Sequence, residues 1–403
     1  MVRARTGFVT RCWLGVPDEN PFGIDNLPYG MAALPNGTTR LVVRIGAWAF
    51  DVGDRGPHAS LDALFAAGPE AWASSRQSIV EWLTDERHRG LVEPHLHPLE
   101  SVRMTLPFTV ADYVDFYASE AHAANVGRTF RPNGEPLTPN WKHLPIGYHG
   151  RSGTVVVSRA EVRRPAGQWR DADGAVRFGP TQRLDLEAEV GFVVGVGSSL
   201  GTPVAVSEFR QHVFGACLVN DWSARDIQAW ENVPLGPFLG KSFATSVSAW
   251  VTPLAALTEA WTAPPRRTPA PLPYLDDSAQ PAGLDIELEV RLNGQLISRP
   301  PFASHYWTPA QMLAHLTVNG ASVRTGDLFA SGTVSGALPD QYGSLLELTR
   351  NGAEPLQLAD GNRRAFLHDG DEVRLSASAR GPHGRIGLGA VHGRVAPALD
   401  HGR

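Results

Sequence analysis

The sequence predicts a mainly β protein with a minor helical content. The 403-residue chain contains 41 glycines and 32 prolines, which suit many turns between short strands better than long helices. Residues 184–190 and 284–292 alternate apolar and mostly acidic side chains, with the period of a strand. The dipeptide Asn293-Gly294 after the second run is typical of a tight hairpin turn.

Composition and charge argue against several classes of protein. A hydrophobic content of 42% with 19% charged residues is that of an ordinary globular chain. The formal net charge of −5 gives no basic surface for nucleic acid. No apolar run approaches the roughly 18 residues of a membrane span, and the N-terminus has no signal-peptide pattern. Cys12 and Cys217 both lie in apolar runs and suit a reducing compartment. We therefore expect a cytoplasmic protein without nucleic-acid or membrane partners.

The first quarter of the chain carries structural signals and no candidate chemistry. Residues 40–52 read as a strand, and a helix is predicted from Ser60, a good N-cap, to Gly68. A second helix is predicted from Pro69, with one apolar face. Runs of polar residues with candidate chemistry begin only after Leu106-Pro107. We therefore expect one domain over residues 1–106 and another over 107–403.

The centre of the chain concentrates polar groups of four kinds. An apolar strand ending at Asp221 leads into a predicted short helix over residues 222–230. The spacing of Asp221, Arg225 and Gln228 would place all three on one side of that helix. A loop rich in proline and glycine then leads to Lys241. This combination favours a functional site over a surface helix with a solvated ion pair.

The strand predicted from residue 184 has one acidic face, formed by Asp185, Glu187 and Glu189. Two explanations are open. The face is an exposed edge whose charges resist aggregation, or its carboxylates bind a cation, in which case oxygen ligands favour Ca²⁺, Mg²⁺ or Mn²⁺ over zinc. Asp115 and Asp221 favour the second explanation, because sites for hard cations gather acids from separate segments. The acids at 285–289 follow the same pattern, and we expect them to be solvated.

A carboxylate and a histidine are further candidates. Glu347 lies between leucines in a predicted strand, so the alternation does not expose it. A buried carboxylate needs a partner, and a histidine is the most useful one. His122 follows Asp115 and Tyr117 in a dense polar run, and it becomes a candidate base if a carboxylate activates it.

The chain resembles the fumarylacetoacetate hydrolase family in eight motifs that occur in the same order: DYVDFYASEAH, PNWKHLPIGYHGR, LDLEAEVGF, VNDWSARDIQAWE, VPLGPFLGKSF, ASGTVSG, GSLLEL and DGDEV. Together with the amino-terminal DNLPYG they cover essentially the whole chain. The shortest motifs are weak alone, but the ordered set is very specific and points to the branch of the family that has a long first domain.

This resemblance implies a fold and an activity. Members of that branch pair a small SH3-like N-terminal barrel with a larger β-roll catalytic domain and form homodimers. They hydrolyse a carbon–carbon bond of 4-fumarylacetoacetate to give fumarate and acetoacetate, the last step of tyrosine and homogentisate breakdown. The alternative is a related hydrolase or decarboxylase that acts on an acylpyruvate or another 1,3-dicarbonyl compound. A non-catalytic protein that keeps the scaffold is disfavoured, because the candidate residues are all present.

The resemblance also implies roles for single residues. His122 matches the general base and Glu347 the acid that orients it, so we predict a hydrogen bond between them. The charge-stabilising set comprises Arg225, Gln228 and Lys241. The implied calcium ligands are Asp115, Glu187, Glu189 and Asp221. A second site, for magnesium, comprises Asp221, Lys241 and Thr245, and Mn²⁺ is an alternative ion.

The implied substrate contacts are Tyr117, Arg131, Tyr148, Gln228 and Thr333. One position departs from the family pattern: Asn232 stands where the animal enzymes carry a substrate-binding tyrosine. An amide can donate and accept hydrogen bonds but reaches less far than a phenol and cannot stack. We therefore expect Asn232 to alter how tightly the substrate is held.

Overall fold

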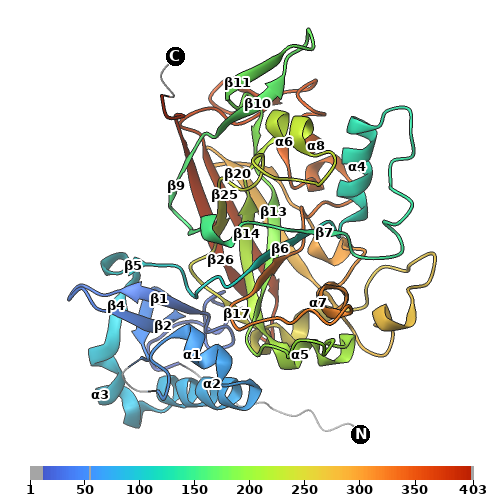
Figure 1. Ribbon diagram of the computed structural model, residues 1–403. Coiled ribbons are helices and arrows are strands. Elements are labelled where there is room, and N and C mark those ends of the chain that lie inside the picture. The colour runs from blue at the N-terminus through green and yellow to red at the C-terminus, as the bar shows by residue number, and fades with distance from the viewer. Residues whose placement is uncertain (1–11, 54–55, 401–403) are drawn as a thin grey trace, which may run out of the picture.

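The computed structural model describes residues 12–53 and 56–400 of the chain. These residues form a mainly β structure, as the sequence predicts, with three larger sheets and four two-stranded ones. The first sheet and its helices lie at one end of the molecule, drawn in blue and cyan, and the strands drawn from green to red build the larger part (Figure 1).

The N-terminal sheet is antiparallel, with the order β4-β3-β2-β1-β5, so the last strand returns beside the first. Its strands are β1 (Tyr29–Ala33), β2 (Thr39–Ile45), β3 (Trp48–Asp51), β4 (Leu96–Pro98) and β5 (Arg103–Met104). The single strand predicted over residues 40–52 is wrong, because Gly46, with φ of 56°, turns the chain and splits it into β2 and β3. The topology suits the SH3-like barrel expected for this part of the chain.

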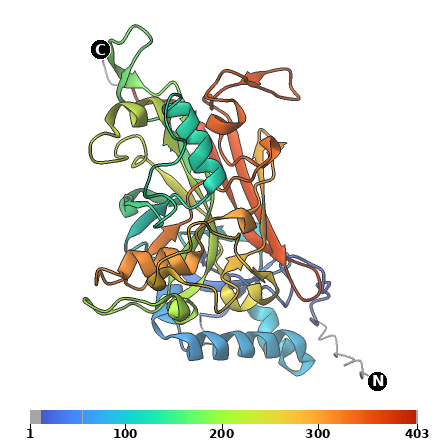
Figure 2. The same ribbon diagram turned by 90° about the vertical axis from the view of Figure 1, so that its right-hand side faces the viewer.

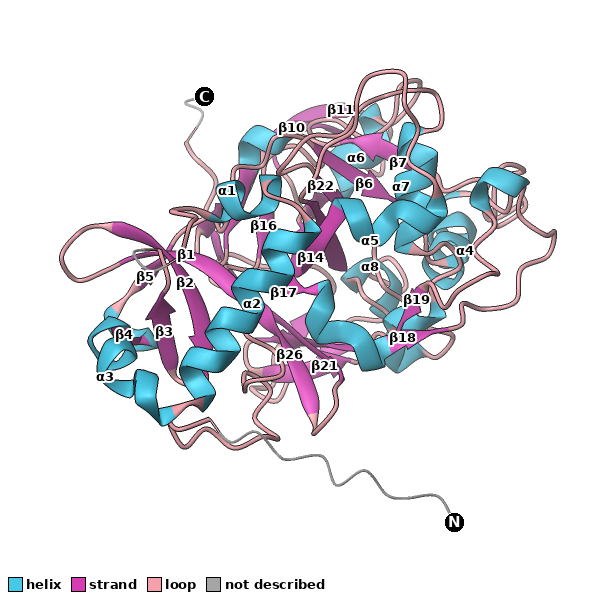
Figure 3. Ribbon diagram, turned by 90° about the horizontal axis from the view of Figure 1, so that it is seen from below, coloured by secondary structure: helices cyan, strands magenta, loops and turns pink. Residues whose placement is uncertain are grey.

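Both helices predicted in this region are confirmed. Helix α1 (Leu61–Ala66) begins after Ser60, whose Oγ accepts a hydrogen bond from the N–H of Ala63 at 3.2 Å. Helix α2 (Pro69–Thr84) follows at once and buries Ile79 and Leu83. Figure 2 shows α2 running beneath the sheets, and Figure 3 shows it from below in front of strands of both parts of the chain. Its apolar face shares one core cluster with strands of the second sheet.

The second sheet has the order β7-β6-β22-β13-β14-β16-β8, and β17 also pairs with β14. Its strands are β6 (Tyr113–Phe116), β7 (Gly147–His149), β8 (Val155–Val157), β13 (Ala188–Val194), β14 (Val213–Asp221), β16 (Thr245–Val247), β17 (Thr252–Pro253) and β22 (Leu328–Ala330). The sheet is curled. Tyr148 on the edge strand β7 reaches Asp221 on β14, although three strands separate the two along the sheet. The curl brings the ends of distant strands together.

The third sheet has the order β21-β20-β25-β26-β9. Its strands are β9 (Glu161–Arg163), β20 (Ile286–Leu292), β21 (Gln295–Ser298), β25 (Glu372–Arg380) and β26 (Arg385–Ala396). The predicted hairpin after β20 is confirmed, since Asn293 and Gly294 have φ of 51° and 82° and β20 pairs with β21. Alternate residues of β20 are fully buried, so this sheet has one core face and one outer face.

Short strand pairs and helices complete the structure. The two-stranded sheets comprise β10 (Ala166–Arg170) with β11 (Val176–Pro180), β12 (Leu184–Asp185) with β15 (Ser223–Ala224), β18 (Trp261–Thr262) with β19 (Gly283–Leu284), and β23 (Leu356–Gln357) with β24 (Arg363–Arg364). The remaining α-helices of the described residues are α3 (Arg89–Val92), α4 (Glu120–Phe130), α5 (Phe209–His212), α6 (Arg225–Glu231), α7 (Pro309–Thr317) and α8 (Leu345–Leu348). No helix in the described part of the chain is long and apolar enough to cross a membrane.

Two local predictions are wrong. The strand ends at Asp221 as predicted, but the helix after it begins at Arg225 and not at residue 222, because residues 223–224 pair with β12, so Asp221 lies outside that helix. Glu347 lies in the short helix α8 and not in a strand, because Ser344 caps that helix by accepting a hydrogen bond from the N–H of Glu347.

A glycine in β26 permits a close contact beside Asp221. A Cβ atom at Gly393 would lie 2.2 Å from the Trp222 ring, which no side chain tolerates. The indole is fully buried, and its Nε1 donates to Ser246 Oγ at 2.9 Å. Trp222 therefore lies against the bare backbone of the C-terminal strand.

Candidate active site

Four buried carboxylates converge where strands of the second sheet end, namely Asp115 of β6, Glu187 just before β13, Glu189 of β13 and Asp221 of β14. One oxygen from each lies within 4.8 Å of the others. Their exposed fractions are 2%, 4%, 0% and 0%. Of the two explanations for the acidic strand, an exposed edge is therefore wrong.

The cluster fits a divalent cation. Both carboxylate oxygens of Glu189 and Oδ1 of Asp115 are buried without a hydrogen-bond partner in the described structure, which is rare for buried polar atoms. Burial, and then the charge of neighbouring carboxylates, raises the pKa of Asp115 and of Glu189 well above the usual range. Unpaired oxygens crowded in this way are the donors that hard cations prefer. The site is thus compatible with a bound divalent metal ion.

Asp221 is surrounded by hydrogen-bond donors. Lys241 Nζ donates to Asp221 Oδ2 at 2.8 Å and to Glu187 Oε2 at 2.5 Å. Tyr148 Oη donates to Asp221 Oδ2 at 2.9 Å, and Thr245 Oγ1 donates to Oδ1 at 2.8 Å. Burial acts to lower the pKa of Lys241, but the charges of Asp221 and Glu187 outweigh it and raise the pKa. The lysine is therefore an ammonium group.

Arg225, the first residue of α6, joins two acids. Its Nη1 lies 2.6 Å from Glu187 Oε1, and its Nε donates to Asp185 Oδ2 at 2.9 Å. Nη1 also donates to Gln228 Oε1, 3.3 Å away and one turn along the same helix. Burial acts to raise the pKa of Glu187, but Lys241 and Arg225 outweigh it and lower the pKa. Glu187 is ionised and held between two cations.

Asp185 is a residue whose role the sequence did not reveal. It accepts hydrogen bonds from the N–H groups of Leu345 and Leu346 at 2.8 and 3.0 Å, at the start of α8. It thus links Arg225 to the helix that carries Glu347. The only signal in the sequence was its position in the acidic strand, and its partners lie 40 or more residues away.

His122 and Glu347 meet in the interior. His122 Nδ1 lies 2.7 Å from Glu347 Oε2, and both side chains are almost fully buried. Burial acts to raise the pKa of Glu347, but His122 and further hydrogen-bond donors outweigh it and lower the pKa. Asn125 Nδ2, Ser335 Oγ and Ser344 Oγ also donate to this carboxylate, at 2.9, 2.9 and 2.8 Å. Sequence reasoning missed these three residues, although Ser344-x-x-Glu347 is a helix-capping pattern.

The predicted substrate contacts are placed unevenly. The Tyr117 ring packs edge-on against His122, with ring centroids 5.4 Å apart. Thr333 is buried, and its Oγ1 has no hydrogen-bond partner in the described structure. Arg131 and Asn232 are exposed, and the Arg131 guanidinium donates to the carbonyl of Pro136 at 2.6 Å. Thr333 is thus buried, Tyr117 and Tyr148 are half-buried, and Arg131 and Asn232 lie at the surface.

A hollow of about 160 Å³ adjoins these residues. It is lined in part by Tyr113, Tyr148, Lys241 and Phe238. The Tyr113 hydroxyl is buried without a hydrogen-bond partner in the described structure, and Lys241 connects the hollow to the carboxylate cluster. A small polar ligand could therefore reach the lysine from this side.

Comparison with known proteins gives consistent similarities. The family model described as fumarylacetoacetate (FAA) hydrolase C-terminal matches residues 112–396. The fumarylacetoacetases of Rattus norvegicus and Homo sapiens are each 42% identical to this chain, over 96% of it and 99% of their own length. That of Arabidopsis thaliana is 40% identical over the same shares. A fumarylacetoacetate hydrolase structure from Exiguobacterium antarcticum, 17% identical, superposes with a TM-score of 0.56 over 92% of this chain and 99% of that one, which indicates a shared fold.

Proposed function

Since the chain belongs to the fumarylacetoacetate hydrolase family, we propose that it is an enzyme that hydrolyses the carbon–carbon bond of 4-fumarylacetoacetate to fumarate and acetoacetate. The observation that carries this proposal is the pairing of His122 with Glu347, in a site that also contains four clustered acids with two buried cations beside them. Such a combination suits the addition of water to a carbonyl group and the departure of a stabilised carbanion.

His122 is the proposed general base. Because the pKa of Glu347 is lowered, its carboxylate is ionised at neutral pH. It therefore accepts a hydrogen bond from a ring nitrogen that carries a proton. Nδ1 of His122 is therefore the donor, which leaves Nε2 as the acceptor. A water molecule at Nε2 loses a proton as its oxygen adds to the substrate carbonyl. The three other donors to Glu347 fix the carboxylate, and thereby the ring.

Asp115, Glu187, Glu189 and Asp221 are proposed to hold a divalent cation. When bound, that ion would supply Lewis-acid stabilisation for the oxygens of the diketone. We propose Ca²⁺ here, since it accepts several carboxylates in a flexible geometry. For the second site we propose Mg²⁺, or Mn²⁺, near Asp221 and Thr245. Lys241 serves there as a charge partner, because an ammonium group has no lone pair to offer a metal.

Arg225, Gln228 and Lys241 are proposed to stabilise negative charge. Water addition places charge on the carbonyl oxygen, and bond cleavage then places it on the departing carbon and its enolate oxygen. That carbon takes up the proton, so one water is consumed and two carboxylate products form. Positioned donors of this kind typically contribute about 2.7–4 kcal/mol each. The guanidinium and the ammonium are already fixed by Glu187, so they need little reorganisation.

Tyr117, Tyr148, Arg131, Asn232 and Thr333 are proposed to bind the substrate. The unpartnered hydroxyl of Thr333 supports a ligand in the interior. The exposed Arg131 and Asn232 would serve its outer carboxylate, and both must turn inward for that role. We propose that this movement accompanies substrate binding.

The test is turnover of authentic fumarylacetoacetate by the purified protein, with and without added divalent ion. His122→Ala should lower kcat by about 10²–10⁴-fold, the usual contribution of a positioned base, and Glu347→Gln should also lower it. Unchanged turnover in His122→Ala would remove the proposed base. Faster turnover of an acylpyruvate or of oxaloacetate by the wild type would assign a different substrate.

We also propose a homodimer in the cytoplasm and a domain boundary near residue 106. Large exposed apolar side chains on the loop after α6, such as Leu235 and Phe238, which are 97% and 65% exposed, support a surface that a partner covers. Light scattering of the purified chain tests this, and a monomer at micromolar concentration would contradict the dimer. Expression of residues 107–403 alone tests the boundary.

A further inference from the structure

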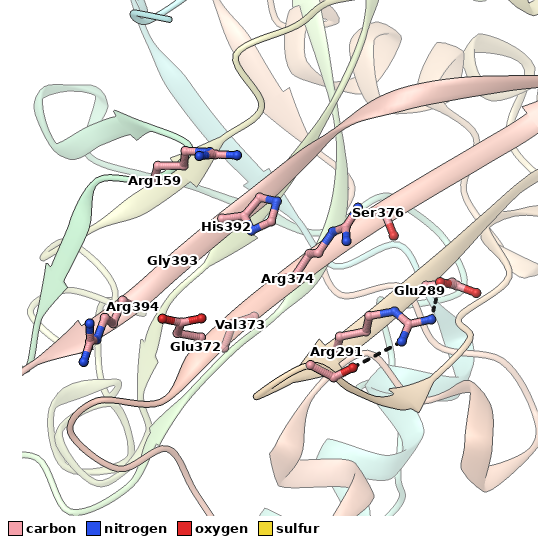
Figure 4. A pocket seen from close by; sticks show the side chains of 11 residues that line it. Arg159, Glu289, Arg291, Glu372, Val373, Arg374, Ser376, His392, Gly393 and Arg394 are labelled. Carbon is pink, nitrogen blue, oxygen red and sulfur yellow. Dashed lines mark hydrogen bonds and ion pairs between the residues drawn. The ribbon is translucent and has the colours of Figure 1, made fainter. Parts of the chain in front are cut away.

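The outer face of the third sheet carries a row of cationic side chains. Arg291 of β20 is the cross-strand partner of Arg374 in β25, and Arg374 is the partner of His392 in β26. Side chains at partnered positions point to the same face. Arg159 extends the row, because its N–H donates to the carbonyl of His392 at 2.8 Å. All four residues line a hollow of about 700 Å³ (Figure 4).

The neighbouring row on the same face is different. There Glu372 is the partner of Arg394, and Arg394 is the partner of Glu161 in β9, so the signs alternate. In the cationic row, Arg291 forms an ion pair with Glu289 at 3.3 Å, which Figure 4 marks. Neither Arg159 nor Arg374 forms an ion pair with any residue of the described structure. The cationic row therefore has excess positive charge.

This arrangement is unfavourable without a ligand. Like charges directly opposite each other destabilise a sheet. Burial, and then the charges of Arg374 and Arg159, lower the pKa of His392, which makes the ring a neutral hydrogen-bonding group. Arg159 also has a left-handed backbone, with φ of 77°, which is uncommon for a residue other than glycine. Its position is fixed by the bond to His392 and by the His392 N–H, which donates to Ser158 Oγ at 2.9 Å.

We propose that Arg159, Arg374 and His392 form a binding site for a small oxyanion with two or more negative charges, carried by phosphate or paired carboxylate groups. Guanidinium forks match the geometry of such groups, and the open hollow suits a ligand of metabolite size. A second copy of the chain is a poor occupant, because a two-fold contact through this row would bring like charges together. None of the proposed catalytic or metal-binding residues lines the hollow.

The test is a titration of the full-length protein with inorganic phosphate, and separately with succinate, at constant ionic strength set by sodium chloride. The readout is the ring signals of His392 in NMR spectra, assigned by comparison with His392→Asn. We expect a saturable shift of these signals. The anion that binds more tightly, phosphate or succinate, indicates whether the ligand carries phosphate or paired carboxylate groups. Arg374→Gln should weaken binding at least tenfold. Arg380→Gln removes the same charge from the exposed end of the same strand, outside the hollow, and should change binding less than twofold.

Thermal unfolding gives a second measurement. Without added anion, Arg374→Gln should raise Tm by about one degree, because it relieves the repulsion, and Arg394→Gln from the alternating row should lower it. Phosphate should raise the Tm of the wild type but not that of Arg374→Gln. The proposal is overturned if the His392 signals show no saturable shift with either anion, if Arg374→Gln binds as tightly as the wild type, or if chloride alone gives the same response.

Discussion

Two extended stretches of this molecule share almost the same sequence and have opposite surroundings, and each runs from a two-residue strand into a longer one, β12 into β13 and β19 into β20. Residues 184–190 read LDLEAEV and residues 284–290 read LDIELEV. In the first, every residue is buried, and the acids meet Arg225, Lys241 and one another. In the second, the four apolar residues are fully buried, while Asp285 and Glu287 are exposed and Glu289 is half-exposed. The local pattern sets the strand, and the tertiary partners decide what its charges do.

The difference lies in what covers the acidic face. The first stretch runs through the interior of the molecule, where Asp221 at the end of β14, Arg225 at the start of α6 and Lys241 in the loop before β16 lie against it. The second belongs to a sheet whose outer face is open to solvent, where an acid such as Glu287 forms a surface ion pair with Arg385. Buried charges are retained only where partners or a ligand compensate them, so only the first stretch has buried acids that form a cluster.

The largest expected difference concerns the first acid of each strand. Asp185→Ala should lower the free energy of unfolding by about 3–5 kcal/mol, because it leaves Arg225 buried with one partner fewer. Asp285→Ala should change it by less than about 0.5 kcal/mol, as for most surface positions. Urea unfolding followed by fluorescence measures both. Equal losses in the two variants would contradict the comparison.

The third acids should differ in catalysis. Glu189→Gln removes a proposed metal ligand, and we expect kcat/KM for fumarylacetoacetate to fall by at least about 100-fold, with loss of the thermal stabilisation that Ca²⁺ gives the wild type. Glu289→Gln loses only its surface contacts with Arg291 and Arg299, at 3.3 and 3.6 Å, and should retain both properties. A Glu189→Gln protein that still responds to Ca²⁺ would refute the ligand assignment.

The buried cluster should also make stability depend on pH in the absence of metal. The folded-state pKa of Asp115 and of Glu189 is raised above the ordinary values of 3.8 and 4.5. Their contribution to stability is therefore present below about pH 4 and is lost as the pH rises through the folded-state pKa. A chelator should thus lower Tm more near pH 8 than near pH 5. Calorimetry with and without the chelator measures this, and a chelator effect that does not change with pH would argue against buried, unpaired carboxylates.

The smallest effect is expected on the exposed strand. Glu287→Gln breaks the pair with Arg385, whose Nη2 lies 2.6 Å away, and should cost less than about 1 kcal/mol. Because both groups face water, 1 M salt should abolish the difference between variant and wild type. If the loss of unfolding free energy in Glu287→Gln persists in 1 M salt, the pair is not screened by solvent, and the contrast with the buried acids would be contradicted.

The sequence predicted strands well where apolar and polar residues alternate strictly. Residues 286–292 and their hairpin were found from alternation and an Asn-Gly turn alone. The strand predicted at Glu347 is a helix, because Leu-Leu-Glu-Leu suits either element locally and the capping hydroxyl of Ser344 favours the helix. The helix after Asp221 begins at Arg225 and not at residue 222, because residues 223–224 pair with β12, nearly 40 residues earlier, which no local pattern indicates.

The sequence predicted which residues belong to the site better than it predicted the contacts between them. The four acids and His122 come from separate segments of the chain, and all five lie in motifs that resemble the family. The role of Asp185 does not follow from its place in the acidic stretch, since it depends on contacts with Arg225 and with the start of α8. Asn125 and Ser335 were not predicted as partners of Glu347, because neither lies in a sequence pattern that indicates a carboxylate partner.

Gly393, near the C-terminal end of the chain, lies against a residue that adjoins the active site. A methyl group there would push against the Trp222 ring, and Trp222 is the residue next to Asp221. Gly393→Ala should therefore damage catalysis through a displaced carboxylate, although the altered strand carries no reactive group. A loss of activity would then trace to a glycine that carries no reactive group, far along the chain from the four clustered acids.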